Sequence, residues 1–194
     1  MKRWIALLIT VAMAASLAAC GTGKDGGKGD AGDKDTKIES ALALLDTVWD
    51  SYGDDEKFPA AGGDYSEENM KSDKPGKFGL EDTASLNSML AVPEDSADRI
   101  DDAASLLHMM NANTFTCGAF HVKKSDDVSA FADTMKESIS TRQWMCGFPD
   151  KLLIVTVGDY VVSAFGEEEN MNTFKEKLLA AYGTAKVVYE EAIE

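Results

Sequence analysis

The fold is decided by residues 151–165, KLLIVTVGDYVVSAF, in which two apolar runs flank the dipeptide Gly158-Asp159. β-Branched and aromatic residues dominate both runs, and such residues favour extended strands. A Gly-Asp pair between two runs of this kind is typical of the tight turn of a β-hairpin. We therefore predict two antiparallel strands, at residues 151–157 and 160–165.

A second pair of apolar runs lies earlier in the chain, at residues 103–110 and 114–122. Asn111-Ala112-Asn113 separates them, and asparagine is a frequent turn residue because it tolerates positive φ. This pattern predicts another hairpin. The first run could instead be the end of a helix that begins near Glu94, but the strand is the interpretation that we adopt.

A helix is predicted after each hairpin. Ser125-Asp126-Asp127 is a helix-start signal, and the apolar spacing of three and four residues that follows it predicts a helix to about Ile139. Residues 167–182 show the same spacing and end at Gly183. The element order β-β-α-β-β-α predicts an α+β fold: a two-layer sandwich of one four-stranded antiparallel sheet with both helices on one face.

The remainder of the domain is less regular. Residues 38–52 carry an apolar stripe at helical spacing and predict an extra N-terminal helix, which Gly53 ends. Residues 54–79 are rich in turn residues and predict an irregular loop region, a length that is unusual inside a compact domain. A short helix is expected at residues 83–90, and residues 185–189 could add a short final strand.

The N-terminus has the pattern of an export signal. Met1-Lys2-Arg3 is basic, residues 4–15 are largely apolar, and small residues follow. Residues 17–21, Leu-Ala-Ala-Cys-Gly, resemble the lipobox of bacterial lipoproteins. The resemblance implies that residues 1–19 are a lipoprotein signal peptide and that Cys20 becomes the lipid-modified N-terminus. The alternative is an ordinary secretory signal that contains a cysteine.

Residues 20–37 are rich in Gly, Asp and Lys and contain no large apolar side chain, so they cannot contribute to a core. We predict a flexible tether here, followed by a single α+β domain over residues 38–194. The expected location is the extracytoplasmic face of the cell membrane, where the lipid on Cys20 anchors the protein at the cell surface. Two acyl chains hold a protein stably on a membrane, whereas one does so only marginally.

The chain is strongly acidic, with a formal net charge of −15 that becomes −17 when Lys2 and Arg3 leave with the signal peptide. A protein of this charge is repelled by nucleic acid and by anionic lipid headgroups. We therefore expect no nucleic-acid partner, and we expect contact with the membrane only through the lipid. A protein or peptide at the cell surface is the expected partner.

Two cysteines remain if Cys20 is lipidated. Cys117 and Cys146 form an even pair in an exported protein, which favours a disulfide. If both thiols are free, they could form a thiol–imidazole site with His121, which shares a strand face with Cys117. His108-Met109-Met110 and Met145 offer soft ligands of the kind that copper(I) accepts, although methionines in such runs are more often core residues.

The sequence contains no motif for catalysis or cofactor binding, so we predict a non-enzymatic protein without a cofactor or a metal ion. Five aromatic residues lie in or beside predicted loops and could line a binding groove or belong to the core: Trp49, Phe58, Tyr65, Phe78 and Trp144. The core interpretation is the one that we favour. Trp144 and His121 remain the candidate site residues.

Four stretches carry a family resemblance: residues 55–64, 109–121, 142–151 and 158–162. They look like segments of small surface lipoproteins from clostridia, whose function is unknown and some of which are labelled bacteriocin transport accessory protein. The resemblance implies no site residue. Redox accessory proteins of bacteriocin export that look like thioredoxin use a CxxC pair, which this chain lacks.

We therefore expect a lipid-anchored extracytoplasmic binding or accessory protein, and an export system is one system to which it could be an accessory. The alternative is a thiol–disulfide or metal-handling surface protein that uses Cys117, Cys146 and His121.

Overall fold

The computed structural model describes residues 38–64, 66–145 and 147–193. The chain divides into two units, residues 1–32 and 33–194, and all the described residues belong to the second unit. The predicted signal peptide, the tether, Cys20 and Cys146 lie outside the described residues. None of the helices described has the length and the apolar character needed to cross a membrane.

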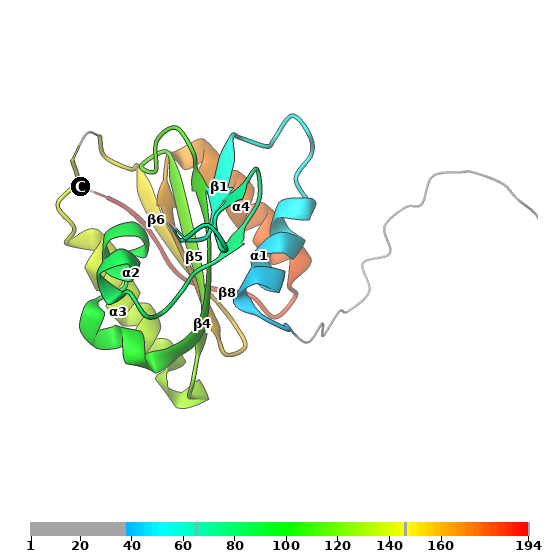
Figure 1. Cartoon of the computed structure of the whole chain (residues 1–194). Helices are drawn as coiled ribbons and strands as arrows, with labels where there is room; N and C mark the ends of the chain where they lie inside the picture. Colours follow the sequence, from blue (N-terminus) through cyan, green and yellow to red (C-terminus); the bar gives the residue numbers. More distant parts are fainter. Residues whose placement is uncertain (1–37, 65, 146, 194) are drawn as a thin grey trace, which may run out of the picture. The chain divides into compact units, whose positions relative to one another are not determined.

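The described unit consists of one antiparallel sheet with helices on both of its faces (Figure 1). The helices are α1 (Ala41–Asp50), α2 (Thr83–Leu90), α3 (Val128–Ser140) and α4 (Glu168–Ala181), with short 3-10 turns at Glu94–Arg99 and Ser125–Asp127. The strands are β1 (Ala60–Gly62), β2 (Lys71–Ser72), β3 (Gly76–Lys77), β4 (Ile100–His108), β5 (Phe115–Val122), β6 (Lys151–Val157), β7 (Tyr160–Gly166) and β8 (Lys186–Ala192).

The α+β class and both long hairpins are confirmed. β4 pairs with β5 and β6 pairs with β7, each antiparallel and in the predicted segments. The ambiguous run before Asn111 is a strand. The sheet order is β2-β1-β4-β5-β7-β6-β8, with β3 also paired to β4.

The predicted four-stranded sheet is too small, because the sheet has eight strands. β8 extends it at one edge by pairing with β6. At the other edge, the segment predicted to be an irregular loop supplies the three short strands β1, β2 and β3. We call residues 60–79, which include these strands, the β1–β3 arm.

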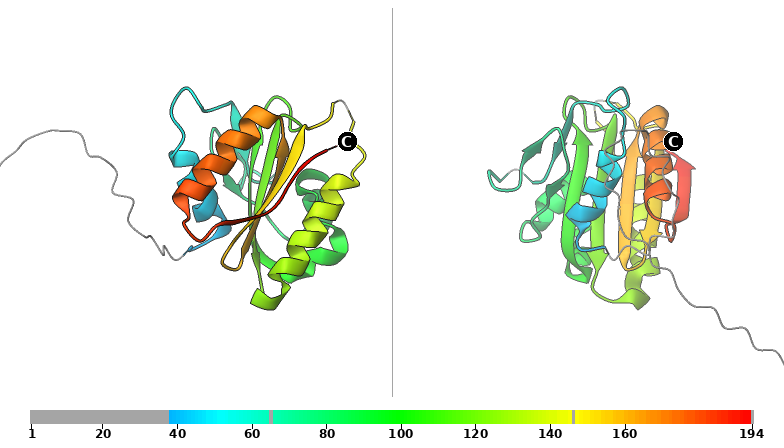
Figure 2. Two further views of the ribbon diagram at one scale, coloured as in Figure 1. Left: turned by 180° about the vertical axis from the view of Figure 1, so that it is seen from behind. Right: turned by 90° about the vertical axis from the view of Figure 1, so that its right-hand side faces the viewer.

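The predicted two-layer arrangement is also wrong, because helices cover both faces of the sheet (Figure 2). Buried residues of α1 and α4 belong to one core, together with Cys117 of β5. Buried residues of α2 and α3 belong to a second core on the opposite face, together with Phe120 of the same strand. The structure is therefore a three-layer arrangement with the sheet in the middle.

The connections explain why α3 and α4 lie on opposite faces. α3 links β5 to β6, and α4 links β7 to β8, and both links skip one strand in the same direction across the sheet. However, β5 and β7 are antiparallel, so the two links start from strands that point in opposite directions. Crossovers between parallel strands nearly always have one hand, and two crossovers of the same hand then lie on opposite faces.

The β1–β3 arm is held by close backbone contacts and by one buried serine. Ser105 of β4 accepts a hydrogen bond from the N–H of Gly63 at 2.9 Å and donates to the Gly63 carbonyl at 3.0 Å. Gly62 lies so close to Gly76 that a β-carbon on Gly62 would be 2.2 Å from the Gly76 nitrogen. Only glycine fits such an approach, so these residues fix the position of the arm against β4.

Candidate functional site

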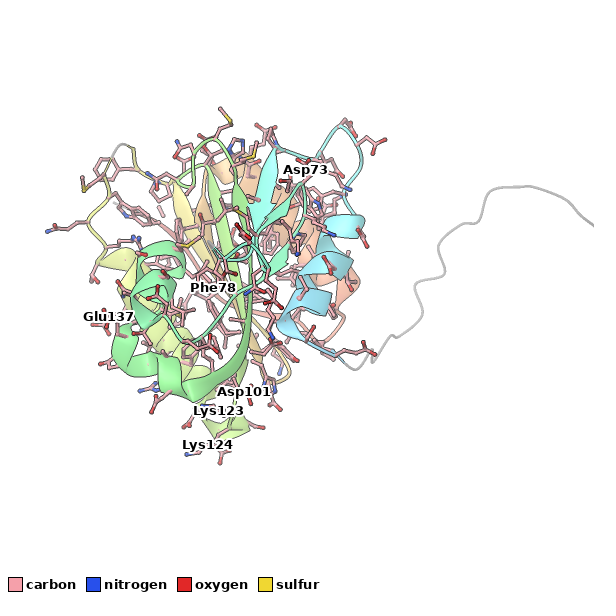
Figure 3. All side chains as sticks on the ribbon, in the orientation of Figure 1. Asp73, Phe78, Asp101, Lys123, Lys124 and Glu137 are labelled. Carbon is pink, nitrogen blue, oxygen red and sulfur yellow. The ribbon has the colours of Figure 1, made fainter. Side chains whose placement is uncertain are left out.

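The two ends of the sheet differ in character, and the predicted site residues are divided between them. His121 lies near the end of β5, where its Nδ1 is 2.5 Å from Asp101 Oδ1 and its ring packs on Tyr160. Asp101 is at the lower end of the molecule in Figure 3, with Lys123 and Lys124 nearby. Trp144 packs on Phe165, which pairs with Thr116 near the start of β5. His121 and Trp144 therefore lie at opposite ends of the sheet and do not form one site.

Cys117 and His121 share one face of β5, as the alternation along a strand predicts. They are four residues apart, which corresponds to about 13 Å along a strand. The Cys117 side chain is fully buried below α1 and α4, and this burial raises the pKa of its thiol. A reactive thiol needs a positive or basic neighbour that stabilises the thiolate, so the structure does not favour the thiol–imidazole alternative.

Burial predicts that Cys117 resists chemical modification in the folded protein. We expect no labelling of Cys117 by iodoacetamide at neutral pH, and full labelling after unfolding with a reductant. Labelling after unfolding without a reductant would show that Cys117 is not bridged. The predicted bridge to Cys146 stays a prediction, because Cys146 is outside the described residues. Rapid labelling of Cys117 in the folded protein, read by mass spectrometry, would contradict the burial.

The candidate metal ligands are also dispersed. Within the described ranges, no three His, Cys, Asp or Glu side chains lie where they could hold a metal ion together. His108 stacks on Phe58, and its Nδ1 accepts a weak hydrogen bond from the N–H of Asn111 at 3.3 Å.

Most of the loop aromatics belong to the core, as we expected. Trp49 and Phe78 are buried, and Phe58 packs against the core below α1. Tyr65 is outside the described residues. Trp144 differs because it packs against the α2–α3 core and also lines a cavity at the surface.

Two adjacent cavities lie at the upper end of the sheet, with volumes of about 330 and 290 Å³. They share Met89, Leu107 and Ala112. The first, which we call the arginine cavity, is further lined mainly by Arg142, Trp144, Met145 and Phe165. The second, the arm cavity, is further lined mainly by Gly62, Gly63, Asp64, Met70, His108 and Met109. We call the two cavities together the methionine groove.

The groove exists because the helices leave this part of the sheet uncovered. α2 and α3 cover the lower part of one face (Figure 1). At the upper end, Leu107 and Thr116 instead line the arginine cavity together with the segment after α3. That segment is fixed by Arg142, which donates to the carbonyls of Asn87 and Ser88 in α2.

The hairpin between β4 and β5 holds the other end of this segment. Asn113 Nδ2 donates to the carbonyls of Met145 and Gly147, at 3.2 and 3.1 Å. The wall of the arginine cavity is therefore tied both to α2 and to the hairpin.

Exposed apolar side chains gather in and beside the groove. Four of them are methionines that are each more than half exposed, and a phenylalanine is also exposed: Met70 55%, Met109 53%, Met110 75%, Met145 81% and Phe148 71%. By contrast, Met135 and Met171 are fully buried in the two cores. These exposed methionines are not core residues. A concentration of large apolar side chains at the surface marks an interaction site.

Asp64 orders the loop on the arm side of the groove. Its carboxylate accepts hydrogen bonds from the side chains of Ser66 and Asn69 and from the N–H groups of Ser66 and Gly79. Partial burial raises the pKa of Asp64, but these hydrogen bonds outweigh it and lower the pKa to about 2. The carboxylate is fully engaged within the loop.

This shift predicts a pH dependence. An aspartate in an unfolded chain has a pKa of about 3.9. The folded-state pKa is lower, so the stabilisation from Asp64 is complete above pH ~4 and is lost as the pH falls toward 2. We expect the wild type to be more stable than Asp64→Asn at pH 5, with the difference shrinking as the pH falls to about 2. Urea unfolding across this range measures it, and a constant difference would contradict the assignment.

Of the groove residues, sequence analysis singled out only His108, Met109, Met145 and Trp144. It missed Met70, Met89 and Arg142, which come from three further segments. One signal was present in the sequence, because Met70, Met109, Met110 and Met145 all fall in turns or loops, where core residues are not expected.

No protein-family model, no curated protein and no solved structure matches this chain.

Proposed function

We propose that this protein is a lipid-anchored extracytoplasmic binding protein that holds an apolar segment of another protein in the methionine groove. The observation that carries the proposal is the group of exposed methionines along two adjacent cavities. Methionine side chains are flexible and polarizable, so they adapt to apolar surfaces of different shapes. An accessory role in an export system fits this proposal, because such an accessory protein would meet the apolar segment of its partner at the cell surface.

The charges of the groove favour an apolar occupant. The chain has 34 acidic residues, yet Asp64 is the only acidic residue among those that line the two cavities. Its carboxylate is already engaged by the loop. Arg142 is the only lysine or arginine among the same lining residues. A charged segment would therefore lose its hydration without gaining a partner along most of the groove.

The groove lies at the end of the sheet opposite to the start of the domain. Asp102, near the start of β4, accepts a hydrogen bond of 2.7 Å from the N–H of Ala41, the first residue of α1. Leu107 and His108 of the groove are at the other end of β4, about 15–20 Å away along the strand. If the lipid on Cys20 and residues 20–37 attach the domain at Ala41, the groove lies at the end of the domain that is far from this attachment point.

A peptide titration with surface variants tests the proposal. The probe is a fluorescent, amidated 15-residue peptide of Leu, Ala and Gln, titrated with residues 33–194, which contain both cores. We expect saturable binding that Met109→Asp weakens about tenfold or more, since one large apolar contact contributes about 1.5–3 kcal/mol.

Leu179→Asp is the matched control. Leu179 is an exposed apolar residue on α4, outside the groove, and is 37% exposed. We expect this variant to bind the peptide like the wild type. Absence of saturable binding, or an equal loss in both variants, would contradict the proposed function.

A further inference from the structure

Arg142 carries a positive charge into the arginine cavity without an ion pair to any carboxylate of the described residues. The guanidinium lies over the Trp144 ring, 5.4 Å from its centroid, and donates to the backbone carbonyls of Asn87 and Ser88. None of the ion pairs between described residues includes Arg142. These pairs include four lysines, each of which contacts a glutamate.

This unpaired charge is half-buried, in a chain with an excess of acidic residues. Burial lowers the pKa of Arg142, but an arginine remains charged at neutral pH. The carbonyls at the end of α2 stabilise this charge only in part, because a helix C-terminus carries about half a negative charge. The guanidinium has five N–H groups, so donors remain after the bonds to Asn87 and Ser88.

The same cavity wall contains a donor that has no hydrogen-bond partner among the described residues. This donor is the buried Nε1 of Trp144. The other described residues that line the arginine cavity are uncharged, so none of them supplies a negative charge next to Arg142.

We propose that the arginine cavity binds the C-terminal carboxylate of an apolar peptide segment, with the carboxylate on Arg142 and the last side chains against Met89, Leu107 and Phe165. This inference rests on the proposed function and names its ligand class. A guanidinium binds a carboxylate through two parallel hydrogen bonds, and capture of a chain terminus is a recurring mode of peptide recognition.

The position of Arg142 favours a chain end over an acidic side chain within a segment. Arg142 lines the arginine cavity and not the arm cavity, so the positive charge lies at one end of the methionine groove. A segment that ends there can be apolar along its remaining length, which matches the uncharged lining. The volume of about 330 Å³ is within the range of small-ligand pockets.

Two peptides that differ only at the C-terminus test the inference. One is the amidated Leu/Ala/Gln peptide, and the other has the same sequence with a free carboxylate. With the wild-type domain we expect the free acid to bind about 10- to 100-fold more tightly than the amide, as expected for a hydrogen bond to a charged group. Arg142→Gln should remove this difference, so that both peptides bind this variant with one affinity, no higher than that of the amide for the wild type, because Arg142 also ties the cavity wall to α2.

Lys124→Gln is the control, because it removes the same charge at the opposite end of the molecule (Figure 3). It should keep the full preference for the free acid.

Equal binding of both peptides to the wild type would overturn the carboxylate site while leaving the proposed function intact, whereas absence of binding by either would overturn both. An equal loss for both peptides in Arg142→Gln would show a purely structural role. Displacement of the free-acid peptide by decanoate at lower concentrations than unlabelled peptide would assign the cavity to a fatty acid, and would also overturn the inference.

Discussion

Replacement of Gly62 by alanine is expected to detach the β1–β3 arm from β4 and to lower the free energy of unfolding by at least about 2 kcal/mol. A β-carbon at this position would lie 2.2 Å from the Gly76 nitrogen, 2.5 Å from the Pro75 carbonyl carbon and 2.6 Å from the Lys74 oxygen. All three are backbone atoms, so the clash cannot be relieved by rotating a side chain. Overpacking of this kind costs about 1–3 kcal/mol, and displacement of Gly63 would also break its two hydrogen bonds to Ser105.

The same change should reduce peptide binding, because Gly62 and Gly63 line the arm cavity. Gly183→Ala is the matched control, since a β-carbon on Gly183 would meet no atom within 4 Å. Urea unfolding of both variants measures the difference, and we expect Gly183→Ala to stay within about 0.5 kcal/mol of the wild type. Equal unfolding free energies for the two variants would show that the arm is not packed as described.

The second large effect is expected in the core between the sheet and α3. Phe120 is fully buried, and its ring meets the Phe131 ring edge-on, with centroids 5.7 Å apart. The ring also fills the space next to Gly118, where a β-carbon would lie 2.4 Å from it. Phe120→Ala removes these contacts and leaves a cavity, so we expect a loss of about 3–5 kcal/mol.

Phe148→Ala provides the comparison, because Phe148 is 71% exposed and its removal should change stability by no more than about 0.5 kcal/mol. A loss below about 1.5 kcal/mol for Phe120→Ala would contradict the assignment of Phe120 to a packed core. Since domains of this size are stable by about 5–15 kcal/mol, the Phe120→Ala protein should remain folded at low temperature and unfold at a much lower urea concentration.

Sequence analysis predicted the strands whose own side chains are apolar enough to indicate a buried strand. Residues 151–157 and 160–166 are apolar on both faces, and every residue of β7 is buried. A run that is apolar on both faces is typical of a strand covered on both sides, so β7 already indicated a three-layer structure. The expectation that both helices lie on one face is wrong because β5 and β7 point in opposite directions, which places α3 and α4 on opposite faces.

The elements that were missed or only suggested depend on partners far away in the sequence. β8 was suggested only as a short final strand at residues 185–189. It is mostly exposed, and it is extended over Lys186–Ala192 because it pairs with β6. β2 and β3 are two residues long, and their position depends on the contact of Gly62 with Gly76 and on Ser105. Short-range patterns cannot reveal such pairing, since propensity is a weak guide where tertiary contacts decide the structure.

The groove was predictable only in part, for the same reason. Met70, Met89, Met109 and Met145 come from four separate segments, and only the fold brings them to the same end of the sheet. Their residue type in loops was visible in the sequence. Their common location could not be read from the sequence. The role of Arg142 also could not, because it depends on contacts with α2 that span about 55 residues.

Labelling of the methionine methyl groups with carbon-13 provides the most direct test that the groove binds an apolar segment. The amidated Leu/Ala/Gln peptide is added to residues 33–194, and the methyl signals are followed by NMR. We predict that the signals of Met70, Met89, Met109 and Met145 shift with one common dissociation constant, while those of the buried Met135 and Met171 stay in place. Shifts that are absent, or equal for groove and core methionines, would contradict a binding site at the methionine groove.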